Sequence, residues 1–161
     1  MFRPMRRARQ ALSPEACAAI LARGTAGVLA TCGDDGYPYA VPLSYVYHEG
    51  TLYFHCARDG HKLDAIARSD KVSFCVIDRD DVIPEAYTTH FASVICFGRA
   101  RPITDPAEKR RALHLLAERY CPEQAEGHQR EIDRFWEQTA MVAVTVEHMT
   151  GKQAVELVTE T

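Results

Sequence analysis

The chain has 161 residues, of which 47% are hydrophobic and 25% are charged, and its formal net charge is −3 at pH 7. This length predicts one globular domain with a proper core, and the slightly acidic balance argues against nucleic acid as a partner. No apolar run approaches membrane-spanning length, and no apolar segment follows the basic residues 1–7, so we expect neither a membrane span nor a secretory signal. We divide the chain into a basic N-terminal arm, residues 1–12, and a single domain, residues 13–161.

Sequence patterns predict a helix and three strands in the first third of the chain. Ser13 and Pro14 suit the N-cap and the first position of a helix, which should end before Gly24. Apolar runs separated by Gly-containing turns then predict strands at residues 26–32, 37–47 and 51–56. Turns this short join antiparallel neighbours, so these strands should form hairpins.

The remaining elements mix strands and helices. They are, in order, a helix after Gly60, strands at residues 71–78 and 89–103 with a polar loop at 79–88 between them, helices from residue 106 and over 125–138, and a strand at 140–149. Asp105 suits the N-cap of the first of the two later helices, and Glu108 is placed to close a capping box with it.

This order of elements favours a mainly β, α+β fold: a six-stranded antiparallel barrel with peripheral helices. Strands joined mostly by hairpins do not make the alternating βαβ pattern of a doubly wound sheet. Neither Gly-x-Gly-x-x-Gly nor Gly-x-x-x-x-Gly-Lys-Ser/Thr occurs, so both standard nucleotide-binding folds are disfavoured.

The six cysteines predict neither disulfides nor a zinc site. No Cys-x-x-Cys pair occurs, and four of the six lie in apolar strand-like runs, where a free thiol behaves as a small hydrophobic group. Tetrahedral zinc needs clustered ligands that this spacing does not supply. We therefore expect a reduced, cytoplasmic protein without a metal site.

The segment after the third strand has the outline of an anion site. A strand leads through Gly60 into a helix, whose first N–H groups are unpaired and whose dipole favours negative charge. Lys62 puts a positive charge at this place, and His61 can supply a second donor. A solvated lysine is the simpler alternative, but the dipole disfavours a cation there unless an anion lies beside it.

Pro38 and Pro42 interrupt the second predicted strand. Each lacks the N–H that a sheet ladder needs, so neither belongs in the middle of a strand paired on both sides. The interruption could free main-chain groups to hydrogen-bond a flat heterocycle. An edge strand or a β-bulge without any ligand is the alternative.

Two further residues stand out. His55 lies at the mouth of the loop that ends in Gly60, although an ordinary surface or core histidine would look the same by itself. It cannot form a nucleophilic pair with Cys56, because adjacent strand residues point to opposite faces. Gly98, in a long strand, predicts a bulge or the close approach of another group.

Taken together, these motifs resemble the pyridoxamine-5′-phosphate-oxidase-like FMN-binding split barrels, and among them the branch related to Nim-type 5-nitroimidazole reductases. The motifs, in chain order, are residues 5–7, 36–39 with 41–45, 52–55 followed by 60–62, 93–100, and 144–147 with 150–152. The resemblance covers roughly residues 5–155 in the same order.

This resemblance implies a homodimer that holds two FMN molecules at its interface. It implies cofactor-binding roles for Ala40, Val41, Pro42, Leu43, Ser44, Tyr45, His55, Cys56, Gly60, His61, Lys62 and Ser93. Ser93 would reach the cofactor from a neighbouring strand or from the other subunit. His55 would lie beside the flavin and substrate and act in catalysis.

The chain departs from true pyridoxamine phosphate oxidases at several positions. Ala40 replaces a basic residue for the cofactor phosphate, Tyr45 a lysine and Ser93 a glutamine, and the C-terminal arginine motif for the substrate phosphate is absent. We therefore expect a flavin-dependent oxidoreductase acting on a small nitroaromatic or similar acceptor rather than on pyridoxamine phosphate. The alternatives are a non-catalytic flavin carrier, or a haem- or deazaflavin-binding barrel of the same fold.

Overall fold

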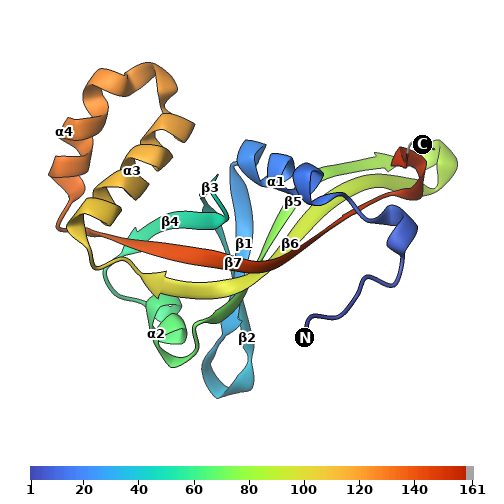
Figure 1. Ribbon diagram of the computed structural model, residues 1–161, viewed down its shortest axis with the longest axis horizontal. Helices are drawn as coiled ribbons and strands as arrows, with labels where there is room; N and C mark the ends of the chain where they lie inside the picture. Colours follow the sequence, from blue (N-terminus) through green and yellow to red (C-terminus); the bar gives the residue numbers. More distant parts are fainter. Residues whose placement is uncertain (159–161) are drawn as a thin grey trace.

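The computed structural model describes residues 1–158 and folds them around an antiparallel sheet (Figure 1). Its strands are β1 (Ala26–Cys32), β2 (Pro38–Ser44), β3 (Val46–His48), β4 (Thr51–Ala57), β5 (Lys71–Ile83), β6 (Thr88–Pro102) and β7 (Thr139–Gln153). Its helices are α1 (Pro14–Arg23), α2 (His61–Arg68), α3 (Pro106–Tyr120) and α4 (Ala125–Phe135). The spatial order of the strands is β2-β1-β5-β6-β7-β4-β3.

The sheet closes into a barrel through a single residue, Tyr45. Strands β2 and β3 stand at opposite ends of the spatial order, yet only Tyr45 separates them in the chain. The predicted second strand, residues 37–47, therefore pairs with β1 in its first part and with β4 in its second. The six-stranded split barrel expected from the sequence is confirmed as the architecture, and the seventh strand arises from this break.

The break leaves an opening on one side of the barrel. Strand β2 pairs with β1 alone, and residues 54–57 of β4 pair with β7 alone. The two facing edges carry main-chain groups that no strand covers. We call this opening, between β2 and residues 54–57, the split.

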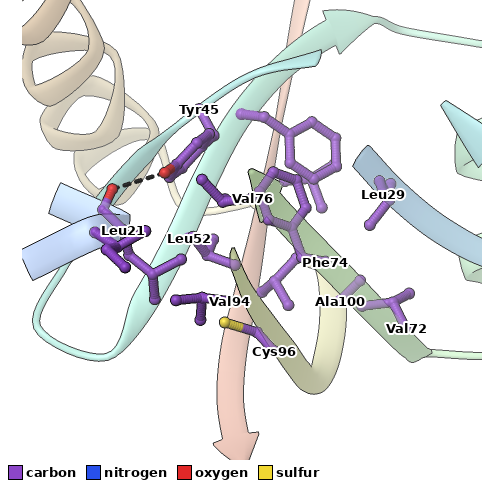
Figure 2. Packing of buried hydrophobic residues seen from close by; sticks show 14 of the residues in the cluster. Leu21, Leu29, Tyr45, Leu52, Val72, Phe74, Val76, Val94, Cys96 and Ala100 are labelled. Atoms are coloured by element: carbon purple, nitrogen blue, oxygen red, sulfur yellow. Dashed lines mark hydrogen bonds between the residues drawn. The ribbon is translucent and has the colours of Figure 1, made fainter. Parts of the chain in front are cut away.

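Large buried side chains fill the interior of the barrel (Figure 2). Tyr45 packs edge-on against Phe74, with ring centroids 5.0 Å apart, and its hydroxyl donates to the carbonyl oxygen of Leu21 at 2.7 Å. Leu21 comes from α1, which packs on this core beside β5, β6 and β7. Burial raises the pKa of the Tyr45 phenol, so the hydroxyl stays a neutral donor.

A second, smaller core joins α3 to the outside of the barrel. It contains Val46, Ile103, Ala112, Leu116, Met141 and Ala143. In Figure 1, α3 and α4 form a hairpin next to β3 and β4, at the end of the molecule opposite the β5–β6 turn. This second core determines which part of the barrel the hairpin covers. Among the described residues, no helix is both long and apolar enough to cross a membrane.

Most local predictions are confirmed. The side chain of Ser13 accepts from the N–H of Ala16 at 3.1 Å, and that of Asp105 accepts from the N–H of Glu108 at 3.0 Å. The register of β6 against β7 shifts after Phe97, and a Cβ at Gly98 would collide with the carbonyl of Thr145. Gly98 thus permits both the bulge in β6 and the close approach of the Thr145 carbonyl of β7.

Three predictions are wrong. Residues 79–83 and 88, expected in a loop, extend β5 and β6 into a long hairpin, because they pair across it despite their polarity. Strand β7 continues through residues 150–153, which pair with β6. The Glu108 carboxylate does not close a capping box; it forms a bidentate ion pair with Arg101, at 2.6 and 3.1 Å.

Candidate functional site

A cavity of about 740 Å³ lies at the split, between the barrel and the α3–α4 hairpin. Two of the residues singled out from the sequence, Ser44 at the end of β2 and His55 on β4, belong to its barrel wall. The hairpin supplies Leu113, Leu116, Ala117, Tyr120, Cys121, Gln124, Gly127, His128, Arg130, Glu131, Ile132 and Phe135. This lining is mainly apolar with a few polar groups, which is the usual composition of a small-molecule site.

The prolines of β2 determine which main-chain groups face the split. The register against β1 is unbroken from Ala26↔Ser44 to Cys32↔Pro38, so β2 contains no bulge. A proline cannot take a ladder position that requires an N–H, so Pro38 and Pro42 must face away from β1. The N–H groups of alternate residues in a strand point to the same side. Ala40 and Ser44 each lie two residues from Pro42, so their N–H groups also point away from β1, to the open edge. Strand β2 is therefore an edge strand, and within residues 1–158 no strand pairs with these two N–H groups.

The side chains of the second strand divide between the two faces of the sheet. Val41 and Leu43 pack against the interior core, whereas Ala40, Pro42 and Ser44 are exposed on the outside. Tyr45 is fully buried in the barrel. Of these predicted cofactor residues, three present side chains to an outer ligand and three do not.

The start of α2 lies beside β2. Gly60 has φ 123°, in the region that favours glycine, and the space around its α-carbon is open. The His61 ring stacks on Tyr39, with centroids 4.0 Å apart, and its Nε2 lies 3.6 Å from a carboxylate oxygen of Asp34. That carboxylate also accepts from Arg68 at 2.7 Å, which offsets its charge near the helix start.

Lys62 is half-buried at the same helix start and lies close to Cys56 at the end of β4. Burial raises the pKa of the Cys56 thiol, and the neighbouring Lys62 ammonium acts in the opposite direction. The predicted anion site therefore has a cation in place, next to the split. Cys56 itself stays a neutral thiol at neutral pH.

Among the predicted cofactor residues, Ser93 is the one that lies far from the split within a single chain. It lies on the outer face of β6, opposite Ile77 of β5. Two strands separate β6 from β2 in the sheet, and at about 4.8 Å per strand spacing this is roughly 14 Å.

Sequence reasoning missed the contribution of the hairpin. The sequence predicts the two helices, from residue 106 and over 125–138, but gives no site role to Tyr120 or to the residues of α4. Helical periodicity indicates which face of a helix is buried, but it does not indicate which part of the protein covers that face. No sequence signal therefore placed this hairpin over the split.

Tyr120 connects the hairpin to the break in the barrel. By the register of β1 and β2, Thr25 and Tyr45 would form the next ladder pair, but the Tyr120 hydroxyl lies between them. It accepts from the N–H of Tyr45 at 2.9 Å, and it can donate to the carbonyl oxygen of Tyr45, at 2.8 Å, or to that of Thr25. The neighbouring Arg119 bonds the carbonyls of Arg23 and Gly24.

No metal centre is found within residues 1–158, because no three His, Cys, Asp or Glu side chains gather closely enough to hold an ion. All six cysteines are free thiols. Burial raises the pKa of Cys96, in the core, to about 12, so this thiol is not a nucleophile at neutral pH.

Comparison with known proteins places this geometry in a family. The family model described as pyridoxamine 5′-phosphate oxidase matches residues 13–153. No curated protein matches the sequence.

Similar solved structures share the fold. A conserved hypothetical protein of Mycobacterium tuberculosis has a TM-score of 0.81 at 19% identity, covering 98% of this chain and 96% of that one. A candidate 5-nitroimidazole antibiotic resistance protein of Bacteroides thetaiotaomicron has a TM-score of 0.75 at 23% identity, covering 89% and 86%. The FAD and heme binding protein of Mycobacterium smegmatis has a TM-score of 0.76 at 20% identity, covering 94% and 77%.

The position of Tyr120 yields a stability prediction. Tyr120→Phe removes the hydroxyl and leaves the N–H of Tyr45, and the carbonyl oxygen of Tyr45 or Thr25 that the hydroxyl bonds, without their partner, so the free energy of unfolding should fall by about 1–3 kcal/mol. Urea denaturation followed by circular dichroism measures this. Tyr87→Phe is the matched control, because Tyr87 is 98% exposed. Equal stability of the two variants would mean that water replaces the hydroxyl at no cost.

Proposed function

Because this chain belongs to the pyridoxamine 5′-phosphate oxidase family, we propose that it binds FMN at the split and reduces a small nitroaromatic or similar acceptor. The observation that carries the proposal is the cavity of about 740 Å³, to which Ser44 and His55 both contribute. Both are among the cofactor-binding residues that the resemblance to this family implies. They come from separate strands, β2 and β4, and meet at one site.

The residues at the split fit an FMN molecule chemically. A phosphate needs cations and N–H donors, and Lys62, His61 and the first N–H groups of α2 supply both kinds. A flat ring needs apolar cover and a few edge donors. The apolar hairpin residues supply the cover, and the free N–H groups of Ala40 and Ser44 on the open edge supply donors.

FMN, when bound, supplies hydride or electron transfer, and the chain's own residues prepare the site for it. The imidazole of His55 is exposed toward the cavity, where it can hold an acceptor or move a proton to it. The hairpin excludes water from one side, and Ser44 can orient a polar edge of the ligand.

FMN rather than FAD is part of this proposal. The similar protein of Mycobacterium smegmatis binds FAD and heme, so the two flavins have to be distinguished directly. Chromatography of the flavin released by denaturing the protein does so, since FMN and FAD separate cleanly. A predominance of FAD would restrict the proposal to flavin binding in general.

We further propose a homodimer. The outer face of the sheet exposes Ile77, Ile95 and Phe97, which are 66%, 40% and 37% accessible, and Ser93 lies among them. Apolar side chains gathered on one face favour a protein partner. A second copy covering this face could bring Ser93 of the partner subunit toward the flavin.

Sedimentation should therefore give about twice the chain mass of 18.0 kDa. Ile95→Glu places a charge in the buried interface, so it should shift the protein toward monomer. Val155→Glu is the control, because Val155 is 60% exposed but lies beyond the end of β7. A monomeric wild type that binds FMN fully would contradict the shared site.

Lys62→Glu should weaken FMN binding. It replaces a cation beside the phosphate with a like charge, and the loss of a charge-assisted hydrogen bond costs about 1.5–3 kcal/mol, or roughly a 10- to 150-fold rise in Kd. Quenching of flavin fluorescence during titration of the apo-protein measures it. The neutral variant Lys62→Met should fall between wild type and Lys62→Glu. If all three bind alike, the phosphate lies elsewhere.

His55→Ala should leave FMN bound yet slow the reoxidation of reduced flavin by a nitroaromatic acceptor. Removal of one acid–base group typically lowers a rate on the order of 10²-fold. Stopped-flow absorbance at the flavin band follows the step. His48→Ala, an exposed histidine on β3 outside this cavity, is the control. If His55→Ala reacts as fast as the control, His55 is only part of the wall, and a non-catalytic flavin carrier becomes the better account.

A further inference from the structure

The lining of the cavity at the split is mainly apolar and carries a few polar groups. Its apolar residues are Leu113, Leu116, Ala117, Ile132 and Phe135, all from the hairpin. Ser44 and His55 lie on the barrel wall, and the charged residues lie on α4. A ligand that fits this lining has a flat apolar body and a polar group that reaches α4.

Arg130 is the charged residue best placed to meet such a group. It lines the cavity together with Gly127, one turn earlier on α4. A Cβ at Gly127 would lie 4.0 Å from the Arg130 guanidinium, an ordinary van der Waals contact, so the guanidinium lies back along the helix beside Gly127. Among residues 1–158, the Arg130 guanidinium forms no ion pair, whereas Arg110 pairs with Asp133 and Arg134 with Glu131.

The other polar groups of α4 at this cavity already have partners in the hairpin. The Glu131 carboxylate lies 3.6 Å from the guanidinium of Arg134, which partly offsets its charge. The Nε2 of His128, a buried residue, lies 2.8 Å from the carbonyl oxygen of Cys121. Since a carbonyl only accepts, this nitrogen donates and the ring is held in place.

We propose that the cavity takes an acceptor combining a flat apolar ring with an anionic substituent, and that Arg130 is the specificity-determining residue that recognises the anion. The inference rests on the proposed function, because it names the substrate class of the same site. A guanidinium matches the two oxygens of a carboxylate with a pair of parallel hydrogen bonds. At an exposed arginine, the gain is roughly 1.4- to 5-fold in affinity.

Calorimetric titration of the purified full chain with two matched ligands tests this. 4-Nitrobenzoate and 4-nitrobenzamide have nearly the same shape and differ in charge. Wild type should bind the carboxylate roughly 1.4- to 5-fold more tightly, and the ratio should shrink as salt screens the interaction. In Arg130→Gln the ratio should fall to about one. In Glu131→Gln it should rise, because a like charge is removed from the lining.

Arg111→Gln is the matched control. Arg111 lies on α3 and lines a separate cavity toward β3 and β4, so its loss changes the net charge equally without touching this site. The control should keep the wild-type ratio. The inference is overturned if wild type binds neither ligand or does not discriminate between them, or if Arg130→Gln keeps the preference.

The phosphate of the flavin is the other anion that Arg130 could meet. Titrations with FMN and with riboflavin, which lacks the phosphate, distinguish the two sources. A loss of the FMN preference in Arg130→Gln would assign the residue to the cofactor and overturn the inference. Failure of the proposed function looks different: the protein would discriminate between the nitrobenzoic ligands but reduce neither.

Discussion

The Tyr120 hydroxyl lies where a ladder pair between Thr25 and Tyr45 would otherwise form, and the arrangement of the rest of the site depends on it. A strand that changes partners must leave the main-chain groups at the changeover without a sheet partner. Here one side-chain hydroxyl accepts from the N–H of Tyr45 and can donate to the carbonyl oxygen of Tyr45 or to that of Thr25. The same contact fixes the end of α3 against the barrel, so the wall of the cavity and the break in the strand are held by one group.

The break also explains why the site lies at the split. A continuous second strand paired on both sides would cover the edges of β2 and β4. Because β2 changes partners at Tyr45, it keeps an open edge. Pro38 and Pro42 have no N–H, so the main-chain donors on this edge are those of Ala40 and Ser44. Ser44 immediately precedes the changeover, and His55 lies in the part of β4 that faces no further strand. A ligand at the split can thus contact main chain, barrel side chains and hairpin together.

The fold was largely predictable from the sequence because its signals are local. Ser13 and Asp105 act as helix caps, and Gly98 allows a bulge, as their residue types indicate. The polar extension of β5 was missed because residues 79–83 owe their strand conformation to pairing with residues 88–92. The site was only partly predictable. The sequence pointed to Ser44 and His55, which both line the cavity, whereas Tyr120 and Arg130 reach it through the packing of a hairpin that helical periodicity does not orient.

The absorbance spectrum of the purified protein after incubation with FMN and removal of free ligand tests the central claim most directly. The account predicts the bands of an oxidised flavin, perturbed from those of free FMN by the apolar cover of the hairpin, with about one flavin bound per chain. A protein that emerges without flavin absorbance would contradict the account. So would one that as isolated shows the spectrum of haem or a deazaflavin and takes up no FMN.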